Sequence, residues 1–309
     1  MVRRIFTLLV MALIAVIPDV VTAFPVSVVD DRCQEILVEA APHRILVLLP
    51  FYAEILLKLD VGDRIVGITD FPEDLPGLYG IPSVGPAHSP SREQIVALRP
   101  DIVFGATDWD GLRGSLESVG VKVLTVGCFG GVPDLGSITG PADVFRVIEA
   151  VSTVNPGSNG TEIVKRIRED LATVARVVKN AEQRSVAVVY PDVSGVSAPT
   201  VAGRGTPEYT GMKAAGGMPV FDHEGYMQIS FEELVRADPE FLIVDPARLA
   251  EVTEDLRLAD MRAVRGQRVC GIKASGWTST SVAASVLELA TILHPVLFNS
   301  EFLKCKVLG

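Results

Sequence analysis

The chain has 309 residues, of which 48% are hydrophobic, and it carries a formal net charge of −10 at pH 7. This length suits two globular domains of ordinary size, each with its own apolar core. The acidic balance argues against nucleic acid and anionic lipid surfaces as partners, because both carry negative charge themselves.

Residues 1–23 are predicted to be a signal peptide. The basic pair Arg3-Arg4 is followed by an apolar stretch over residues 5–17 and by small residues that favour cleavage after Ala23. The apolar stretch is too short to cross a bilayer core of about 30 Å as a helix. The paired arginines leave both the Sec and the twin-arginine routes open, and no cysteine at the cleavage point could receive a lipid. We therefore expect export to the periplasm.

Residues 24–158 are predicted to form an N-terminal α/β lobe with its lead-in to a linker. In chain order, strands are expected at 24–31, 35–39, 45–49, 65–68, 83–85, 102–104 and 121–126, and helices at 53–58, from Ser91 to the break at Pro100, and at 112–118. Strands that alternate with helices pair in parallel through crossover connections. Ligands of such open sheets bind beyond the carboxyl ends of the strands.

A long amphipathic helix is predicted from Thr161 to Ala181, within an interlobe segment of residues 159–182. This stretch contains no Gly or Pro, and apolar residues recur in it every three or four positions. A helix of this length would extend about 30 Å, which is comparable to the width of a small domain. We expect a rigid rod that limits hinge motion between two lobes.

Residues 183–309 repeat the plan of the first lobe. Strands are expected at 185–190, 241–244 and 268–272, and helices after the N-cap Thr206, after Ser230, and at 255–264 and 281–293. The stretch that begins at Ser230 has the same order of cap, helix, proline and strand as the one that begins at Ser91, and the opening strand of each lobe ends in proline. The repetition predicts an α/β fold with two Rossmann-like lobes, each with a parallel central sheet, joined by a single long helix.

The four cysteines lie far apart, without metal-ligand spacing. An oxidising compartment permits three pairings. Cys270 with Cys305 would close the C-terminal lobe, and Cys33 with Cys128 would be its N-terminal counterpart. Buried free cysteines are the alternative.

Several phrases in a fixed order resemble a known family. They are Arg44-Ile45-Leu46-Val47 with Glu54, Val61 to Gly67, Glu93 to Asp101, and Ser230 to Leu234. With the mid-chain helix, they make the chain similar to the periplasmic substrate-binding proteins that serve ABC importers for ferric siderophores, haem and cobalamin. The resemblance covers essentially the whole mature chain. It implies the chelatase-like, class III binding-protein fold, a monomer, and an ABC permease with its ATPase as partners.

The same resemblance implies a metal chelate as cargo, bound in the interlobe cleft. A ferric siderophore is expected first, and haem or cobalamin next. The chain itself is then expected to need no cofactor.

Glu93 and Glu232 take the second helical position after Ser91 and Ser230. In the family, a glutamate at this position in each lobe docks onto arginines of the permease, so the resemblance implies this role for both. A plainer interpretation is available, because Gln94 and Glu233 complete capping boxes and the helix dipole favours a carboxylate there.

The expected ligand contacts share a location at predicted strand-end loops and are mostly aromatic. They are Phe51, Tyr52, His88, Trp109, Arg204, Tyr226 and Trp277. Large flat or chelate ligands need apolar area with a few polar anchors. Arg204 lies between two glycines before a helix, where an anionic group could bind. His88, His223 and Tyr226 could ligate a metal, but no metal site is predicted, and loop aromatics can instead seal the edge of a lobe.

Enzymatic function is not expected, because none of the common nucleotide-binding, zinc-protease or hydrolase motifs occurs. The alternatives are a metal-chelatase or metal-transfer enzyme of related fold, and a secreted ligand scavenger or sensor that works without a permease.

Overall fold

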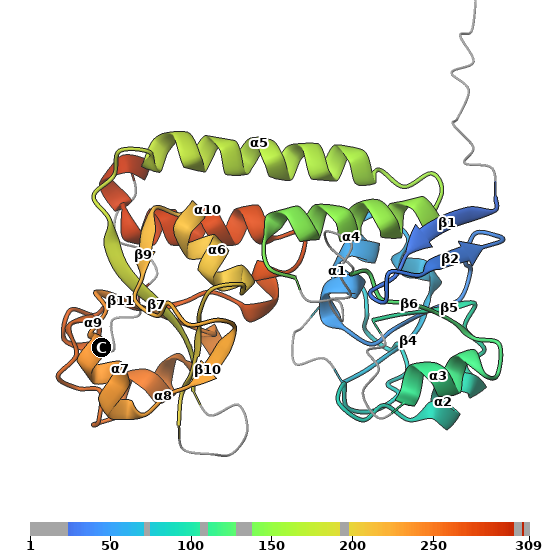
Figure 1. Cartoon of the computed structure of the whole chain (residues 1–309), viewed down its shortest axis with the longest axis horizontal. Coiled ribbons are helices and arrows are strands. Elements are labelled where there is room, and N and C mark those ends of the chain that lie inside the picture. The colour runs from blue at the N-terminus through green and yellow to red at the C-terminus, as the bar shows by residue number, and fades with distance from the viewer. Residues whose placement is uncertain are drawn as a thin grey trace, which may run out of the picture.

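The computed structural model describes residues 24–70, 75–105, 111–127, 138–191, 198–299 and 305. Figure 1 shows two α/β lobes side by side, with one long helix, α5, lying across the same edge of both. Among the described residues, no helix has the length and apolar character that a membrane crossing needs.

The N-terminal lobe contains a four-stranded sheet in the order β4-β3-β5-β6, and all of its strand pairs are parallel. The strands are β3 (Ile45–Val47), β4 (Ile65–Ile68), β5 (Ile102–Phe104) and β6 (Lys122–Leu124), and the helices are α1 (Pro50–Lys58), η1 (Gly62–Arg64), α2 (Arg92–Ala97) and α3 (Leu112–Glu117). The predicted parallel pairing is confirmed. The strand expected at 83–85 is reduced to one bridge between Ile68 and Ser83.

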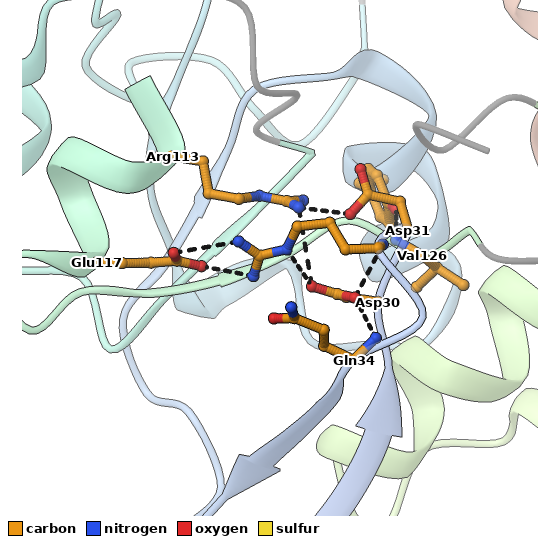
Figure 2. Close-up of polar contacts among 8 residues, drawn as sticks. Asp30, Asp31, Gln34, Arg113, Glu117 and Val126 are labelled. Atoms are coloured by element: carbon orange, nitrogen blue, oxygen red, sulfur yellow. Dashed lines mark hydrogen bonds and ion pairs between the residues drawn. The ribbon is translucent and has the colours of Figure 1, made fainter. Parts of the chain in front are cut away.

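An antiparallel hairpin, β1 (Val26–Val29) with β2 (Glu35–Val38), precedes this sheet. A buried charge cluster ties its turn to the lobe (Figure 2). Arg113 Nη1 donates to Asp31 Oδ1 at 2.5 Å and lies 3.8 Å from Asp30 Oδ2, and all three residues are at most 1% exposed. At the same turn, Arg32 bridges Asp30 and Glu117, with 2.9 Å to each.

Helix α5 (Gly160–Val178) confirms the predicted rod, although it ends earlier than expected. Val164 and Ile167 belong to the core of the N-terminal lobe, and Val174 and Val178 belong to the core of the C-terminal lobe. Leu171, between these pairs, packs against both cores. One apolar stripe therefore fastens the helix to both lobes.

Helix α4 (Pro141–Val154) packs against α5 and was not predicted. Its signal was present, because Pro141 stands at the first helical position and the apolar residues buried by α4 recur at helical spacing.

Helix α10 (Val282–Leu293) makes a second connection between the lobes. Val282 and Ala283, in its first turn, are buried in the N-terminal core, whereas Val286, Leu289 and later residues belong to the C-terminal core. Two helices thus cross between the lobes, although the sequence predicted only one.

The C-terminal lobe contains a six-stranded sheet in the order β10-β8-β7-β11-β12, with β9 also paired to β7. The strands are β7 (Arg184–Tyr190), β8 (Thr200–Ala202), β9 (Gly217–Pro219), β10 (Tyr226–Gln228), β11 (Phe241–Val244) and β12 (Val269–Gly271). Strands β7, β11 and β12 are parallel, as predicted, and β9, which was not predicted, pairs in parallel with β7. Strands β8 and β10 form an antiparallel extension that the sequence analysis did not include.

The remaining helices of this lobe are α6 (Pro207–Ala214), α7 (Phe231–Ala237), η4 (Pro246–Arg248), α8 (Leu249–Thr253), α9 (Arg262–Arg265), η5 (Ala274–Trp277) and η6 (Pro295–Phe298). The Thr206 cap is confirmed, because its hydroxyl accepts from Tyr209 N at 3.2 Å. Of the helix predicted at 255–264, only the last residues are helical, where α9 begins. The Asp255 carboxylate accepts from Arg257 N and forms a turn between α8 and α9.

Cys270 and Cys305 form a disulfide, which is one of the pairings that the sequence left open. Cys33 is also disulfide-bonded. Its expected partner, Cys128, lies outside the described residues, so that pairing stays a prediction.

Candidate functional site

A pocket of about 760 Å³ lies between the lobes. We call it the interlobe pocket. The N-terminal lobe contributes α1 and the segment after residue 74, and the C-terminal lobe contributes α10 and the segments that follow β11 and β12. The lining residues are Glu54, Leu57, Lys58, Leu75, Pro76, Pro246, Gly271, Lys273, Ser275, Gly276, Ser281, Ala284, Ser285 and Glu288. The pocket therefore lies at the carboxyl ends of C-terminal strands, where ligands of open α/β sheets bind.

Glu54 joins the two lobes beside this pocket. Its Oε1 atom accepts hydrogen bonds from the Thr280 hydroxyl at 2.8 Å and the Ser281 hydroxyl at 2.6 Å. Both hydroxyls lie at the start of α10, where the helix dipole also favours a carboxylate. A second polar contact between the lobes runs from the Thr210 hydroxyl of α6 to the Thr139 carbonyl oxygen at 2.7 Å.

None of the predicted ligand contacts that the structure describes lines the interlobe pocket. Tyr52 is fully buried, and its hydroxyl accepts from Val126 N at 2.7 Å. Trp277 is 1% exposed and packs on Gly211, where an added Cβ would lie 2.6 Å from the indole ring. These two aromatic residues belong to the lobe cores, and full burial leaves them no surface for a ligand.

The other predicted contacts of the N-terminal lobe differ in exposure. Phe51 is half-buried, with its ring centroid 4.3 Å from that of Tyr52. His88 is exposed. Trp109 lies outside the described residues.

Tyr226 belongs to a cluster around Glu208, a residue that the sequence analysis did not single out. Glu208 is buried on α6 and accepts from the hydroxyls of Tyr190 at 2.5 Å and Tyr226 at 2.8 Å. Burial raises the pKa of Glu208 and of both phenols. Tyr190 ends β7, so the cluster lies at the carboxyl end of a central strand, and Tyr226 is 53% exposed there although its hydroxyl is bonded to Glu208.

Arg204 is exposed but already paired. Its side chain donates to Asp222 Oδ2 and to Glu224 Oε1, each at 2.8 Å, and the Glu224 hydrogen bond is the main cause of its raised pKa. An anionic ligand at Arg204 would have to compete with two carboxylates, so the predicted anchor is weaker than its position suggested.

The two glutamates predicted to dock the permease are both exposed. The caps that precede them are confirmed, because Ser91 Oγ accepts from Gln94 N and Ser230 Oγ accepts from Glu233 N. Figure 1 shows α2 and α7, which carry Glu93 and Glu232, on the side of the molecule away from α5. A hydrogen bond from its own backbone N–H is the main cause of a lowered pKa at Glu232, which keeps this carboxylate charged.

Within the described ranges, no group of three or more His, Cys, Asp or Glu side chains is placed to hold a metal ion.

The profile of the family described as periplasmic binding protein matches residues 45–275. A Bacillus subtilis relative, an uncharacterized ABC transporter substrate-binding lipoprotein, YvrC, is 24% identical over 89% of this chain and 88% of its own. A vitamin B12-binding protein of Vibrio parahaemolyticus is 28% identical over 65% of this chain and 70% of its own. A Helicobacter pylori structure, Ceue with Ni(II) bound, superposes with a TM-score of 0.74 at 18% identity, over 89% of this chain and 90% of that one.

Proposed function

The chain belongs to the periplasmic binding protein family, and on this premise we propose that it binds a metal chelate between its lobes and delivers it to the membrane permease of an ABC importer. The observation that carries the proposal is the interlobe pocket. Its volume of about 760 Å³ falls within the range of about 300 to 1,000 Å³ that is typical of small-molecule sites.

The cargo is proposed to be a ferric siderophore first, and haem or a corrinoid next. The ferric chelate follows from the resemblance of the sequence, and the corrinoid is supported by the relative that is named as a vitamin B12-binding protein. Each of these ligands encloses its metal before it reaches the protein.

A binding panel tests this proposal. Ferrichrome, ferric citrate, haem and cyanocobalamin are titrated against the mature protein by calorimetry. We expect at least one chelate to bind with 1:1 stoichiometry and micromolar or tighter affinity, and the metal-free ligands to bind far more weakly. Failure of all four would contradict the proposal. Tight binding of Fe³⁺ or Co²⁺ alone would instead favour a metal-transfer protein.

Binding is proposed to close the lobes only slightly, because α5 and α10 both cross between them. Any large rotation would pull Val282 and Ala283 out of the N-terminal core. Small-angle scattering with the chelate that binds should show a change in the radius of gyration of less than about 1 Å, whereas freely hinged lobes would close much further.

Glu93 and Glu232 are proposed to dock the permease from the face away from α5. Exposed ion pairs contribute only about 0.2 to 1 kcal/mol each, so the pair would orient the complex more than bind it. In a reconstituted transporter, Glu93→Lys with Glu232→Lys should abolish uptake while chelate affinity stays unchanged. Glu162→Lys with Glu169→Lys, on the exposed face of α5, is the matched control. Uptake that survives the first double change would refute the docking role.

Export with cleavage after Ala23 is also proposed, from the leader pattern of the sequence. Expressed in a Gram-negative host, the protein should be recovered from the periplasmic fraction with Phe24 as its first residue. Recovery of the uncleaved chain would contradict this.

A further inference from the structure

A single leucine projects from the surface of the C-terminal lobe. Leu256 lies in the turn between α8 and α9 and is 89% exposed, the largest exposed fraction among the large hydrophobic side chains that the structure describes. Isolated apolar side chains are common on protein surfaces and need no function of their own. Two further features of this turn indicate that Leu256 has a partner, because the turn is rigid and it lies beside Glu232.

The turn is fixed around Leu256. The Asp255 carboxylate accepts from Arg257 N and Nε, each at 2.9 Å, and from Arg257 Nη2 at 2.6 Å. The Arg257 guanidinium carbon lies over the Phe231 ring, 3.5 Å from its centroid. Leu258 is 2% exposed and belongs to a core cluster of this lobe. Leu256 is therefore held in place before any partner arrives, so the turn loses little conformational entropy on binding.

The turn is also continuous with the proposed docking face. Phe231, on which Arg257 packs, directly precedes Glu232 on α7. Figure 1 shows α7 and α8 on the side of the molecule away from α5. A protein interface of standard size covers about 800 Å² on each partner. A protein that binds Glu232 therefore also covers the turn that carries Leu256.

The surroundings of Leu256 are acidic. The segment of residues 249–262 contains four carboxylates and two arginines, which gives it a net charge of −2, and α7 adds two glutamates and one arginine. Both arginines of the segment are already paired with aspartates. Glu254 and Asp260 are exposed and have no ion pair within the part of the chain that the structure describes. An apolar side chain with an acidic rim fits a protein surface that offers an apolar hollow surrounded by basic side chains.

We propose that Leu256 is the apolar anchor through which the C-terminal lobe binds the permease, and that it enters a hollow rimmed by basic side chains. This inference rests on the proposed function and adds a residue to its docking face. An exposed ion pair changes a dissociation constant only about 1.4- to 5-fold, whereas burial of a leucine changes it about 10-fold or more. The glutamates therefore orient the complex, and Leu256 supplies most of the affinity of this lobe.

The test measures binding of the chelate-free mature protein to the transporter, the permease with its ATPase, in lipid nanodiscs. Leu256→Ser should raise the Kd about 10-fold, because it removes the buried apolar surface. The loss should persist at about 0.5 M salt, which screens ion pairs but not apolar burial. Leu256→Met keeps an apolar side chain of similar size and should stay within about twofold of the native Kd. Because Leu256 is exposed, the melting temperature and the affinity for the chelate should not change.

Val296→Ser is the matched control. Val296 is 85% exposed, but it lies on η6 and lines a small pocket with Asn180 and Ala181, just beyond the end of α5. This variant should bind the transporter as the native protein does. Native binding by Leu256→Ser, or an equal loss in Val296→Ser, would refute the anchor.

Comparison with the glutamate variant separates this inference from the function on which it rests. If Glu93→Lys with Glu232→Lys abolishes uptake while Leu256→Ser binds as the native protein does, the anchor is refuted and the docking role of the glutamates stands. If neither variant changes binding or uptake, the docking face itself is wrong. If the native protein does not bind the transporter at all, the proposed function fails and the anchor fails with it.

Discussion

Removal of the Arg113 guanidinium from the buried cluster in Figure 2 should lower the free energy of unfolding. Asp30 keeps two hydrogen bonds from Arg32 and one from Gln34 N at 2.8 Å, so it remains paired in an Arg113→Met variant. Asp31 loses its ion pair, and its Oδ2 atom already has no hydrogen-bond partner among the described residues. The variant therefore leaves one buried carboxylate uncompensated.

The magnitude follows from the pKa of Asp31, which burial raises above its ordinary value of 3.8. Without Arg113 the carboxyl should stay protonated in the folded protein. Protonating a group of pKa 3.8 costs about 1.36 kcal/mol per pH unit, which is about 4 kcal/mol at pH 7 and about 1.6 kcal/mol at pH 5. This cost agrees with the loss of about 3–5 kcal/mol that is typical when one partner of a buried pair is removed.

The sign of the pH dependence is fixed by the same argument. A carboxyl whose pKa is higher in the folded than in the unfolded state binds more protons when folded, so the free energy of unfolding falls as the pH rises above 3.8. The stability difference between Arg113→Met and the native protein should therefore grow from pH 5 to pH 7.

Urea unfolding followed by circular dichroism at pH 5, 6 and 7 measures this difference. Arg113→Met combined with Asp31→Asn should remove the extra pH dependence, because no carboxyl is left to protonate. Arg166→Met, which breaks an exposed pair on α5, should cost less than about 0.5 kcal/mol. A loss below about 1 kcal/mol at pH 7, or one that is the same at every pH, would refute the reasoning.

Three further predictions concern the C-terminal lobe and its link to the other. Glu54→Ala removes two partly buried hydrogen bonds to a carboxylate, so it should lower the free energy of unfolding by about 2 kcal/mol and speed amide hydrogen exchange in the first turn of α10. Glu54→Gln should have a smaller effect. Unchanged exchange would contradict the role of Glu54 in joining the lobes. Burial lowers the pKa of His294 below 6.5, so the folded state binds fewer protons and stability should fall as the pH drops below 6.5. His294→Gln should flatten that part of a melting-temperature profile, and an unaltered profile would show that His294 is not responsible. Cys270→Ser with Cys305→Ser removes the disulfide that closes a loop with a sequence separation of 35, and it should cost about 2–4 kcal/mol in urea unfolding. A midpoint equal to that of the native protein would contradict this.

The strongly periodic parts of the fold could be predicted from the sequence. Helix α5 has its apolar residues at helical spacing. The N-caps Ser91, Thr206 and Ser230 are local sequence signals, and α2, α6 and α7 begin directly after them. The short antiparallel strands β8 and β10 carry no comparable pattern, because three residues are too few to show an alternation. The first part of the helix expected at 255–264 is a turn instead, because the Asp255 side chain accepts from the backbone N–H of Arg257.

The residues of the candidate site were harder to predict from the sequence than the helices were. A residue after a strand end can face the cleft or the core, and Tyr52 turns toward the core because its hydroxyl has a partner at Val126. Glu54 stood in a phrase typical of the family, yet its partners Thr280 and Ser281 lie far away in sequence, so only the assembled lobes reveal the link. Isolated lysines such as Lys58 give no signal until the fold brings them to one pocket.

The central claim, that a chelated metal is carried between the lobes, is tested most directly by native mass spectrometry of the exported protein purified from the cells that produce it. The account predicts a 1:1 complex whose added mass contains iron or cobalt with its organic ligand, and which is released when the chain unfolds. A protein that carries only a bare metal ion, or no ligand after growth with chelates in the medium, would contradict the account.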